Sequence, residues 1–304
     1  MAETYSTLTA LFTDIADAIR EKTGDASVIV ADDFPDVIRE SLQAIQPKPY
    51  LTFSSPSSFT LAVNDTTKHW DGTLEYSTDA STWSTWDGTT TLSSATSGSE
   101  NVLYLRGIGN TVIAGNNSNY KWVLTGTDIK CIGNIENLLD YATVASGAHP
   151  TMASSCYKYM FQGCTSLIQA PALPATTLAG SCYYKLFQGC TSLTQAPSLP
   201  ATTLATYCYS YMFYGCTGLA QVSALPATTL ASNCYSSMFA GCTGLKLSST
   251  QTGEYTVTYR IPMSGTGTTA TGALLNMFAS TGGTFTGTPE INTTYYLSNT
   301  NTIV

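Results

Sequence analysis

The side chains that could carry chemistry are two histidines, scattered acids and nine cysteines in a chain of 304 residues. Asp71 and Asp87 form the best enzymatic candidate, a carboxylate pair of the kind that hydrolyses glycosides. Each of them precedes a glycine, and Asp-Gly is typical of a β-hairpin turn. His69 and His149 stand alone in the sequence. We therefore expect a protein that is not an enzyme.

The cysteines could hold a metal or form disulfides. Eight of them recur in a repeated segment, and the ninth is Cys131. Zinc sites use closely spaced cysteine pairs or added histidines, and neither pattern is present. Two cysteines that span one short helix are about 12 Å apart, and helices of adjacent repeats lie about 8–10 Å apart, so both pairings are too wide for a disulfide. We expect buried free thiols, with no metal and no cofactor.

A 26-residue segment is repeated almost four times between Cys156 and Leu245, and its first copy reads CYKYMFQGCTSLIQAPALPATTLAGS. Its first half has helical apolar spacing and ends at Gly163, whereas its second half is apolar, extended and interrupted by prolines. The apolar positions of the first half are Tyr157, Met160, Phe161 and Cys164. Each unit is thus expected to be a short helix plus an extended segment, stacked on the next unit as a solenoid.

The residues CYxxMFxGCTSLxQAPxLPATTLA resemble the BspA-like leucine-rich repeats of bacterial surface proteins. In this threonine- and alanine-rich form they also resemble tail-associated proteins of gut bacteriophages. The resemblance covers all four units, and it implies a leucine-rich-repeat fold with an adhesive or host-interacting role.

Residues 1–46 predict two short amphipathic helices, which are too small to cover both apolar stripes by themselves. The stripes are Leu8, Leu11, Phe12, Ile15 and Ile19 in the first helix, and Phe34, Ile38 and Leu42 in the second. These helices could pack on the neighbouring domain or on each other, or could dock to copies of themselves or to a larger assembly. The sequence LFTDIADAIREKTG followed by IVADDFPDVI resembles N-terminal segments of phage tail and other structural proteins. That likeness favours attachment to other virion proteins and a homo-oligomer, with a trimer as the common state of fibres.

The expected fold class is α+β with several domains. Residues 1–46 form a helical attachment segment, and residues 50–126, with short alternating strands and all four tryptophans, form a β-sandwich. Residues 127–247 form the leucine-rich-repeat solenoid, with an N-terminal cap around Ile135, Leu138 and Leu139. Residues 248–304 form a β-rich C-terminal cap around a partial echo of the repeat.

Sequence differences among the repeats point to a binding surface, because the most variable positions of the first half follow one helical face. The candidate ligand-binding residues are Lys158, Tyr159, Tyr184, Lys185, Tyr207, Tyr211 and Tyr214. Exposed positions also vary when nothing packs on them, and for the variation alone this simpler explanation is preferred over binding. What favours binding is the composition of the face, which is Tyr, Ser, Asn and Lys without acids. The rival face carries Gln169, Gln195 and Gln221 in the extended half.

Charge narrows the choice of partner. Net charge is −8, only 11% of residues are charged, and the repeats hold no acid. No basic stripe suits nucleic acid, and no apolar run reaches the roughly 18–20 residues that span a membrane. Charges interrupt the N-terminal region where a signal peptide would need an apolar core.

We expect a phage virion protein, a tail or head fibre made in the host cytoplasm, that binds a host-surface protein or glycan. The alternatives are a BspA-like bacterial surface adhesin and a purely structural decoration or tube.

Overall fold

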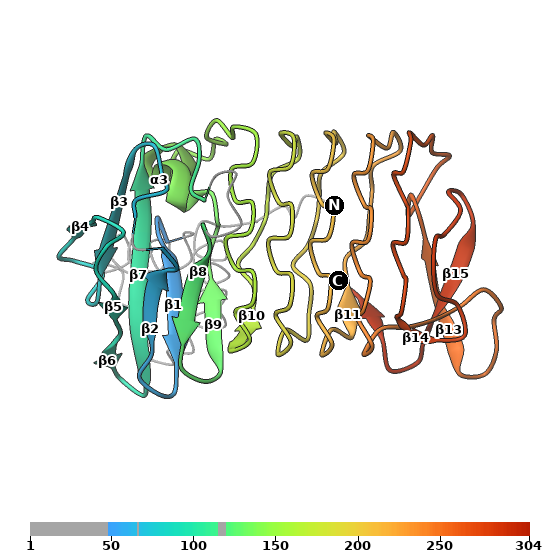
Figure 1. The fold of residues 1–304 in the computed structure, drawn as a ribbon, viewed down its shortest axis with the longest axis horizontal. Helices are drawn as coiled ribbons and strands as arrows, with labels where there is room; N and C mark the ends of the chain where they lie inside the picture. The colour runs from blue at the N-terminus through green and yellow to red at the C-terminus, as the bar shows by residue number, and fades with distance from the viewer. Residues whose placement is uncertain (1–47, 66, 115–119) are drawn as a thin grey trace, which may run out of the picture. The chain divides into compact units, whose positions relative to one another are not determined.

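The computed structural model describes residues 48–65, 67–114 and 120–304. Pro49–Val304 forms one compact unit, which Figure 1 shows as a row of repeats between two sets of strands. The two helices expected over residues 1–46 lie outside the described residues.

The N-terminal part of this unit contains two sheets. The larger has the order β10-β9-β1-β7-β3-β4, with β6 also paired to β7, and the smaller has the order β5-β2-β8. The strands of the larger sheet are β1 (Leu51–Ser55), β3 (Thr73–Ser77), β4 (Ser84–Trp86), β6 (Ala95–Ser97), β7 (Glu100–Ile108), β9 (Ile129–Ile132) and β10 (Leu167–Gln169). Those of the smaller sheet are β2 (Thr60–Val63), β5 (Leu92–Ser93) and β8 (Trp122–Thr125). Strand β10 belongs to the first repeat, so the larger sheet continues past residue 126 into the repeats.

Buried aromatic rings fill the space next to these sheets. Trp86 lies 5.1 Å from Trp70 and 5.7 Å from Trp122, measured between ring centroids. Trp122 in turn packs edge-on against Phe161 of the first repeat at 5.8 Å. Trp70, Trp86 and Trp122 are all buried, and their core is continuous with that of the repeats.

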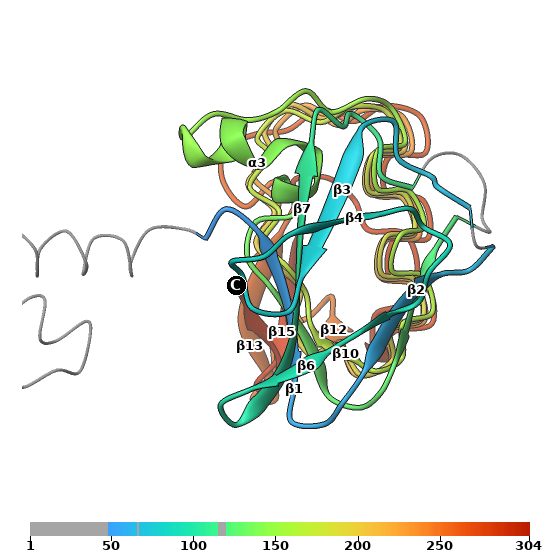
Figure 2. The ribbon, with the colours of Figure 1, turned by 90° about the vertical axis from the view of Figure 1, so that its left-hand side faces the viewer.

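The expected α+β class and its helix-containing leucine-rich-repeat solenoid are wrong. The described part of the chain is nearly all β, and its one helix is α3 (Asn137–Ala145), which contains the buried Leu138 and Leu139. The first half of each repeat consists of turns instead of a helix. When the unit is viewed along the row, the repeats nearly superpose (Figure 2).

Backbone hydrogen bonding explains why turns replace helices. The N–H groups of Tyr157, Tyr159 and Phe161 donate to carbonyls of the next repeat at 2.9–3.0 Å, so they cannot donate to the i−4 carbonyl of a helix. The N–H of Met160, between them, donates to the carbonyl of Tyr157 three residues earlier. A left-handed residue recurs every fourth position, at Ser155, Tyr159 and Gly163. This turn pattern points the same i, i+3, i+4 and i+7 residues inward as a helix would, and all four predicted apolar positions are buried.

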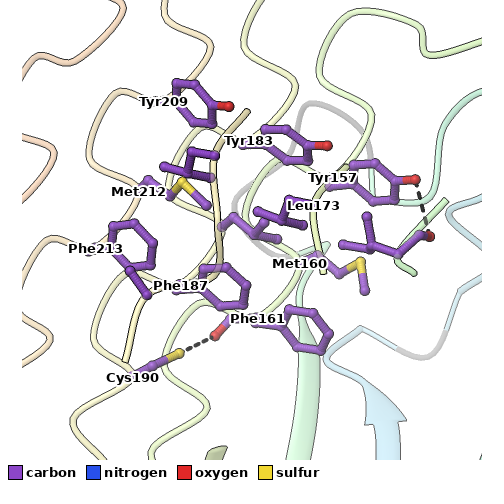
Figure 3. Packing of buried hydrophobic residues seen from close by; sticks show 14 of the residues in the cluster. Tyr157, Met160, Phe161, Leu173, Tyr183, Phe187, Cys190, Tyr209, Met212 and Phe213 are labelled. Carbon is purple, nitrogen blue, oxygen red and sulfur yellow. Dashed lines mark hydrogen bonds between the residues drawn. The ribbon is translucent and has the colours of Figure 1, made fainter. Parts of the chain in front are cut away.

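Equivalent side chains stack in register along the row (Figure 3). The rings of Tyr157 and Tyr183 are 5.6 Å apart at 10°, and those of Phe161 and Phe187 are 5.6 Å apart at 3°. Phe278 stacks on Phe239 at 5.7 Å. Residues 272–281 therefore add one more layer, or rung, to the row of repeats, although their sequence matches the repeat only in part.

All nine cysteines are buried and unbridged. The separation of about 8–10 Å expected between adjacent repeats is wrong. Their turn segments are joined by backbone hydrogen bonds and so lie about 5 Å apart. The second thiol of a repeat instead donates to a carbonyl of the preceding repeat: Cys190 to Phe161 at 3.1 Å and Cys216 to Phe187 at 3.0 Å.

The C-terminal residues close the other end of the row. The remaining strands are β11 (Gln221–Val222), β12 (Lys246–Ser248), β13 (Tyr255–Arg260), β14 (Gly282–Gly283), β15 (Thr294–Ser298) and β16 (Thr302–Ile303), and β12 to β15 form one sheet at this end. Strand β16 pairs with β11 in the third repeat. Beside it, the buried Asn301 accepts from the N–H of Lys246 at 2.9 Å and donates to the carbonyls of Ala220 and Gly244 at 3.0 Å.

Candidate ligand-binding surface

The outward side chains of the turn segments are held by an unusual backbone. Tyr159, Lys185 and Tyr211 occupy the same place in successive repeats, and all have positive φ, at 66°, 57° and 56°. A side chain in this region costs about 1–2 kcal/mol, which glycine avoids. The chain does use glycine four residues later, at Gly163. The left-handed positions 159, 185 and 211 therefore carry large side chains despite a conformational penalty.

The seven candidate residues lie together, and we call them the Tyr–Lys cluster: Lys158, Tyr159, Tyr184, Lys185, Tyr207, Tyr211 and Tyr214. Tyr184 is at its centre. Its ring centroid is 5.7 Å from that of Tyr159, 5.9 Å from that of Tyr211 and 6.4 Å from that of Tyr207. Tyr214 extends the surface at 5.6 Å from Tyr211.

Both lysine ammonium groups lie over these rings. Lys158 Nζ is 5.0 Å from the centroid of Tyr184, and Lys185 Nζ is 5.3 Å from the same ring. Both distances fall within the range of attractive cation–π contacts. The ring of Tyr184 thus lies close to two positive charges.

The cluster keeps its positive charge without an acidic neighbour. Ion pairs join Arg106 to Glu75 and Lys130 to Glu100, whereas neither Lys158 nor Lys185 forms an ion pair with a described acid. Burial, and then the charge of Lys185, lower the pKa of Lys158 below its ordinary value. Burial also raises the pKa of Tyr159. The surface therefore combines aromatic faces with two closely spaced, incompletely solvated cations.

Exposure varies across the cluster. Tyr207 and Tyr214 are 42% and 41% exposed, while the other members are half-buried. In the fourth repeat the corresponding Ser236, Ser237 and Ala240 are small and buried, so the cluster ends after the third repeat.

The helical face expected for the variable positions describes this surface only in part. A helical face would also expose Ser155, which is 5% exposed. The turn backbone directs a narrower set of side chains outward, and that set contains all seven candidate residues. Their proximity is a property of the structure, whereas their binding role stays a prediction.

The rival glutamine face forms a shallow groove of about 320 Å³ between the first two repeats. Gln169 and Gln195 line it and are exposed. Gln221 lies in β11, is half-buried, and pairs with Thr302 of β16. The chain's own C-terminal strand thus occupies one side of the third glutamine.

The two aspartates considered for catalysis act as turn anchors. Asp71 accepts hydrogen bonds from Thr111 and from the N–H of Val112. Asp87 accepts from the hydroxyl and N–H of Thr89, and these bonds lower the pKa of its carboxyl.

Both histidines, isolated in the sequence, have carboxylate partners in the structure. His69 pairs with Asp65 at 2.5 Å and stacks on Tyr120. The i, i+4 spacing of Asp65 and His69 is the sequence feature that indicates this pair. His149 pairs with Glu136 at 2.8 Å across thirteen residues, and no sequence pattern marks that pair.

Within the described ranges, no group of three or more His, Cys, Asp or Glu residues is placed to hold a metal ion. The same part of the chain contains no helix long and apolar enough to cross a membrane. No protein-family model, curated protein or solved structure matches the chain.

Proposed function

We propose that this protein is a recognition component of a virion, and that it binds an acidic glycan of a host or mucosal surface through the Tyr–Lys cluster. The observation that carries this proposal is the placement of Lys158 and Lys185 over the ring of Tyr184 on a surface without acids.

The chemistry of the cluster suits such a ligand. Tyrosine rings offer flat amphipathic area at low conformational cost, and their hydroxyls can bond to sugar hydroxyls. Lys158 and Lys185 can donate charge-assisted hydrogen bonds to a carboxylate or sulfate. The net charge of −8 makes this positive patch a local exception, so it can orient an anion that approaches the protein.

The turn backbone supports binding by keeping the side chains in place. Each rung is bonded to the next: the N–H of Tyr159 donates to the carbonyl of Tyr184 at 3.0 Å, and that of Lys185 to the carbonyl of Ser210 at 3.1 Å. A surface ordered before the ligand arrives loses less entropy on binding.

The virion part of the proposal rests on the two sequence resemblances. In it, residues 1–46 attach the protein to other virion proteins and to its own copies, and Pro49–Val304 carries the recognition surface. Electron microscopy of particles, with a label at the C-terminus, tests this attachment. Particle-bound label supports a virion component, and its absence from intact particles refutes one.

A glycan screen with the full chain tests recognition. We expect binding to glycans that carry carboxylate or sulfate groups and loss of binding to the same glycans after those groups are removed. Equal binding to both forms contradicts an acidic ligand, and binding only to proteins would move attention to the glutamine groove.

A further inference from the structure

A second hollow lies at the start of the repeats and shares no residue with the Tyr–Lys cluster. It has a volume of about 390 Å³, enough for one monosaccharide. Polar groups reach it from Glu136, His149, Thr176 and Thr177, and Met152 and Leu178 are among its apolar residues.

The histidine in this hollow is held in one orientation. Its Nδ1 lies 2.8 Å and 3.0 Å from the two carboxylate oxygens of Glu136. Glu136 is 1% exposed, whereas the ring of His149 is 52% exposed. A carboxylate only accepts hydrogen bonds, so Nδ1–H donates to it and Nε2 is left for a ligand, as an acceptor whenever the ring is neutral. Glu136 is thus a positioning residue for a half-exposed imidazole.

We infer that this hollow is a second ligand site and that it takes a neutral sugar residue. A sugar hydroxyl can donate to Nε2 of His149, while the hydroxyls of Thr176 and Thr177 can accept from or donate to its neighbours. The apolar wall formed by Met152 and Leu178 suits the C–H face of the ring.

The charges around the hollow favour a neutral ligand over an acidic one. No lysine or arginine is among its lining residues, and its one carboxylate, Glu136, repels anions. The Tyr–Lys cluster has the opposite character, with two lysines and no acid. The two sites therefore differ in ligand class, and this inference does not depend on the proposed function of the cluster.

The chain has only two histidines, so NMR of their ring nitrogens and protons tests the site directly. The probes are the methyl glycosides of galactose, glucose and mannose, N-acetylglucosamine and, as the acidic counterpart, galacturonic acid. We expect at least one neutral sugar to shift the His149 signals in a saturable way while His69 stays unchanged. If no neutral sugar moves His149, or if galacturonic acid moves it equally, the inference is overturned.

Two variants separate binding from folding. Thr177→Val removes an exposed hydroxyl from the hollow, and Thr203→Val removes the equivalent hydroxyl one repeat away. We expect the first to weaken sugar binding about tenfold and the second to leave it unchanged. Equal effects would contradict the site. Glu136→Gln should give His149 a mixed tautomer population in its ¹⁵N shifts, and an unchanged tautomer would refute the positioning role.

Discussion

The ammonium group of Lys185 lies 5.2 Å from the ring centroid of Tyr211, one repeat further along the row. The contact joins two rungs on the outer surface, as the aromatic stacks do in the core. It places a cation beside aromatic faces that any ligand of this surface would also touch.

Tyr184 is the centre of the cluster, so Tyr184→Ala should weaken binding of an acidic glycan by about tenfold or more. The change removes ring contacts with three tyrosines and two lysines, and stacking contacts of this size contribute about 1–2 kcal/mol. Titration calorimetry would measure the loss. Tyr255→Ala, at a half-buried tyrosine in β13, is the matched control. An equal loss in both variants would argue against a specific role of Tyr184.

As the pH rises, affinity for an acidic glycan should begin to fall at a lower pH than the ordinary pKa of a lysine would predict. Burial and the charge of Lys185 lower the pKa of Lys158, so its ammonium group loses its proton as the pH rises toward 10.5 from below. Affinity for an acidic glycan should therefore fall over this range, by about tenfold for one charged contact. Lys158→Arg keeps its charge and should flatten that part of the profile. Identical profiles of the two proteins would show that Lys158 does not contact the anion.

Two substitutions at left-handed positions should change the stability of the protein in opposite directions. Gly163→Ala, at φ 78° with no atom within 4 Å of the added Cβ, should destabilise by about 1–2 kcal/mol through backbone strain alone. Ser237→Gly, at φ 52° on a buried rung, should stabilise by up to about 1 kcal/mol. Urea unfolding would measure both changes. Destabilisation by Ser237→Gly would mean that contacts of the serine side chain, and not backbone strain, dominate at position 237.

The buried thiols predict a loss of stability at alkaline pH. Burial raises the pKa of Cys164 and Cys216 to about 12, whereas an unfolded thiol titrates near about 8.5. The unfolded chain therefore binds fewer protons between these values, and stability is full below about pH 8.5 and falls as the pH rises toward 12. The free energy of unfolding should drop by at least about 3 kcal/mol between pH 8 and pH 10.5.

Thiol labelling gives an independent measure of that burial. Iodoacetamide at pH 8 should leave the native thiols of Pro49–Val304 unmodified and should label all nine cysteines in urea. Rapid labelling of the native protein, or a flat stability profile up to pH 10.5, would contradict thiols buried in the stack.

The sequence predicts much of the local pattern. Short strands are expected within residues 50–126, and β1 and β3 are among those found there. The 26-residue period identifies equivalent residues, and the Phe161, Phe187 and Phe213 rings do stack in register. Both results follow from burial, since alternation and repetition record which side chains avoid water.

The fold class could not be predicted in the same way. Apolar spacing of i, i+3, i+4 and i+7 fits a helix and also fits a ladder of four-residue turns, and only inter-repeat hydrogen bonds distinguish the two. The pairing of Glu136 with His149 depends on the path between α3 and the first repeat, so spacing alone does not reveal it.

The most direct measurement is the affinity of the full chain for an acidic glycan when the cluster loses its charge. Lys158→Asn with Lys185→Asn removes both cations, and asparagine tolerates the positive φ at position 185. Lys246→Asn is the control at an exposed lysine in β12, outside the cluster. We expect the double variant to lose at least about a hundredfold in affinity, together with most of the salt dependence, while the control binds normally. Unchanged affinity of the folded double variant would contradict the cluster as the recognition surface.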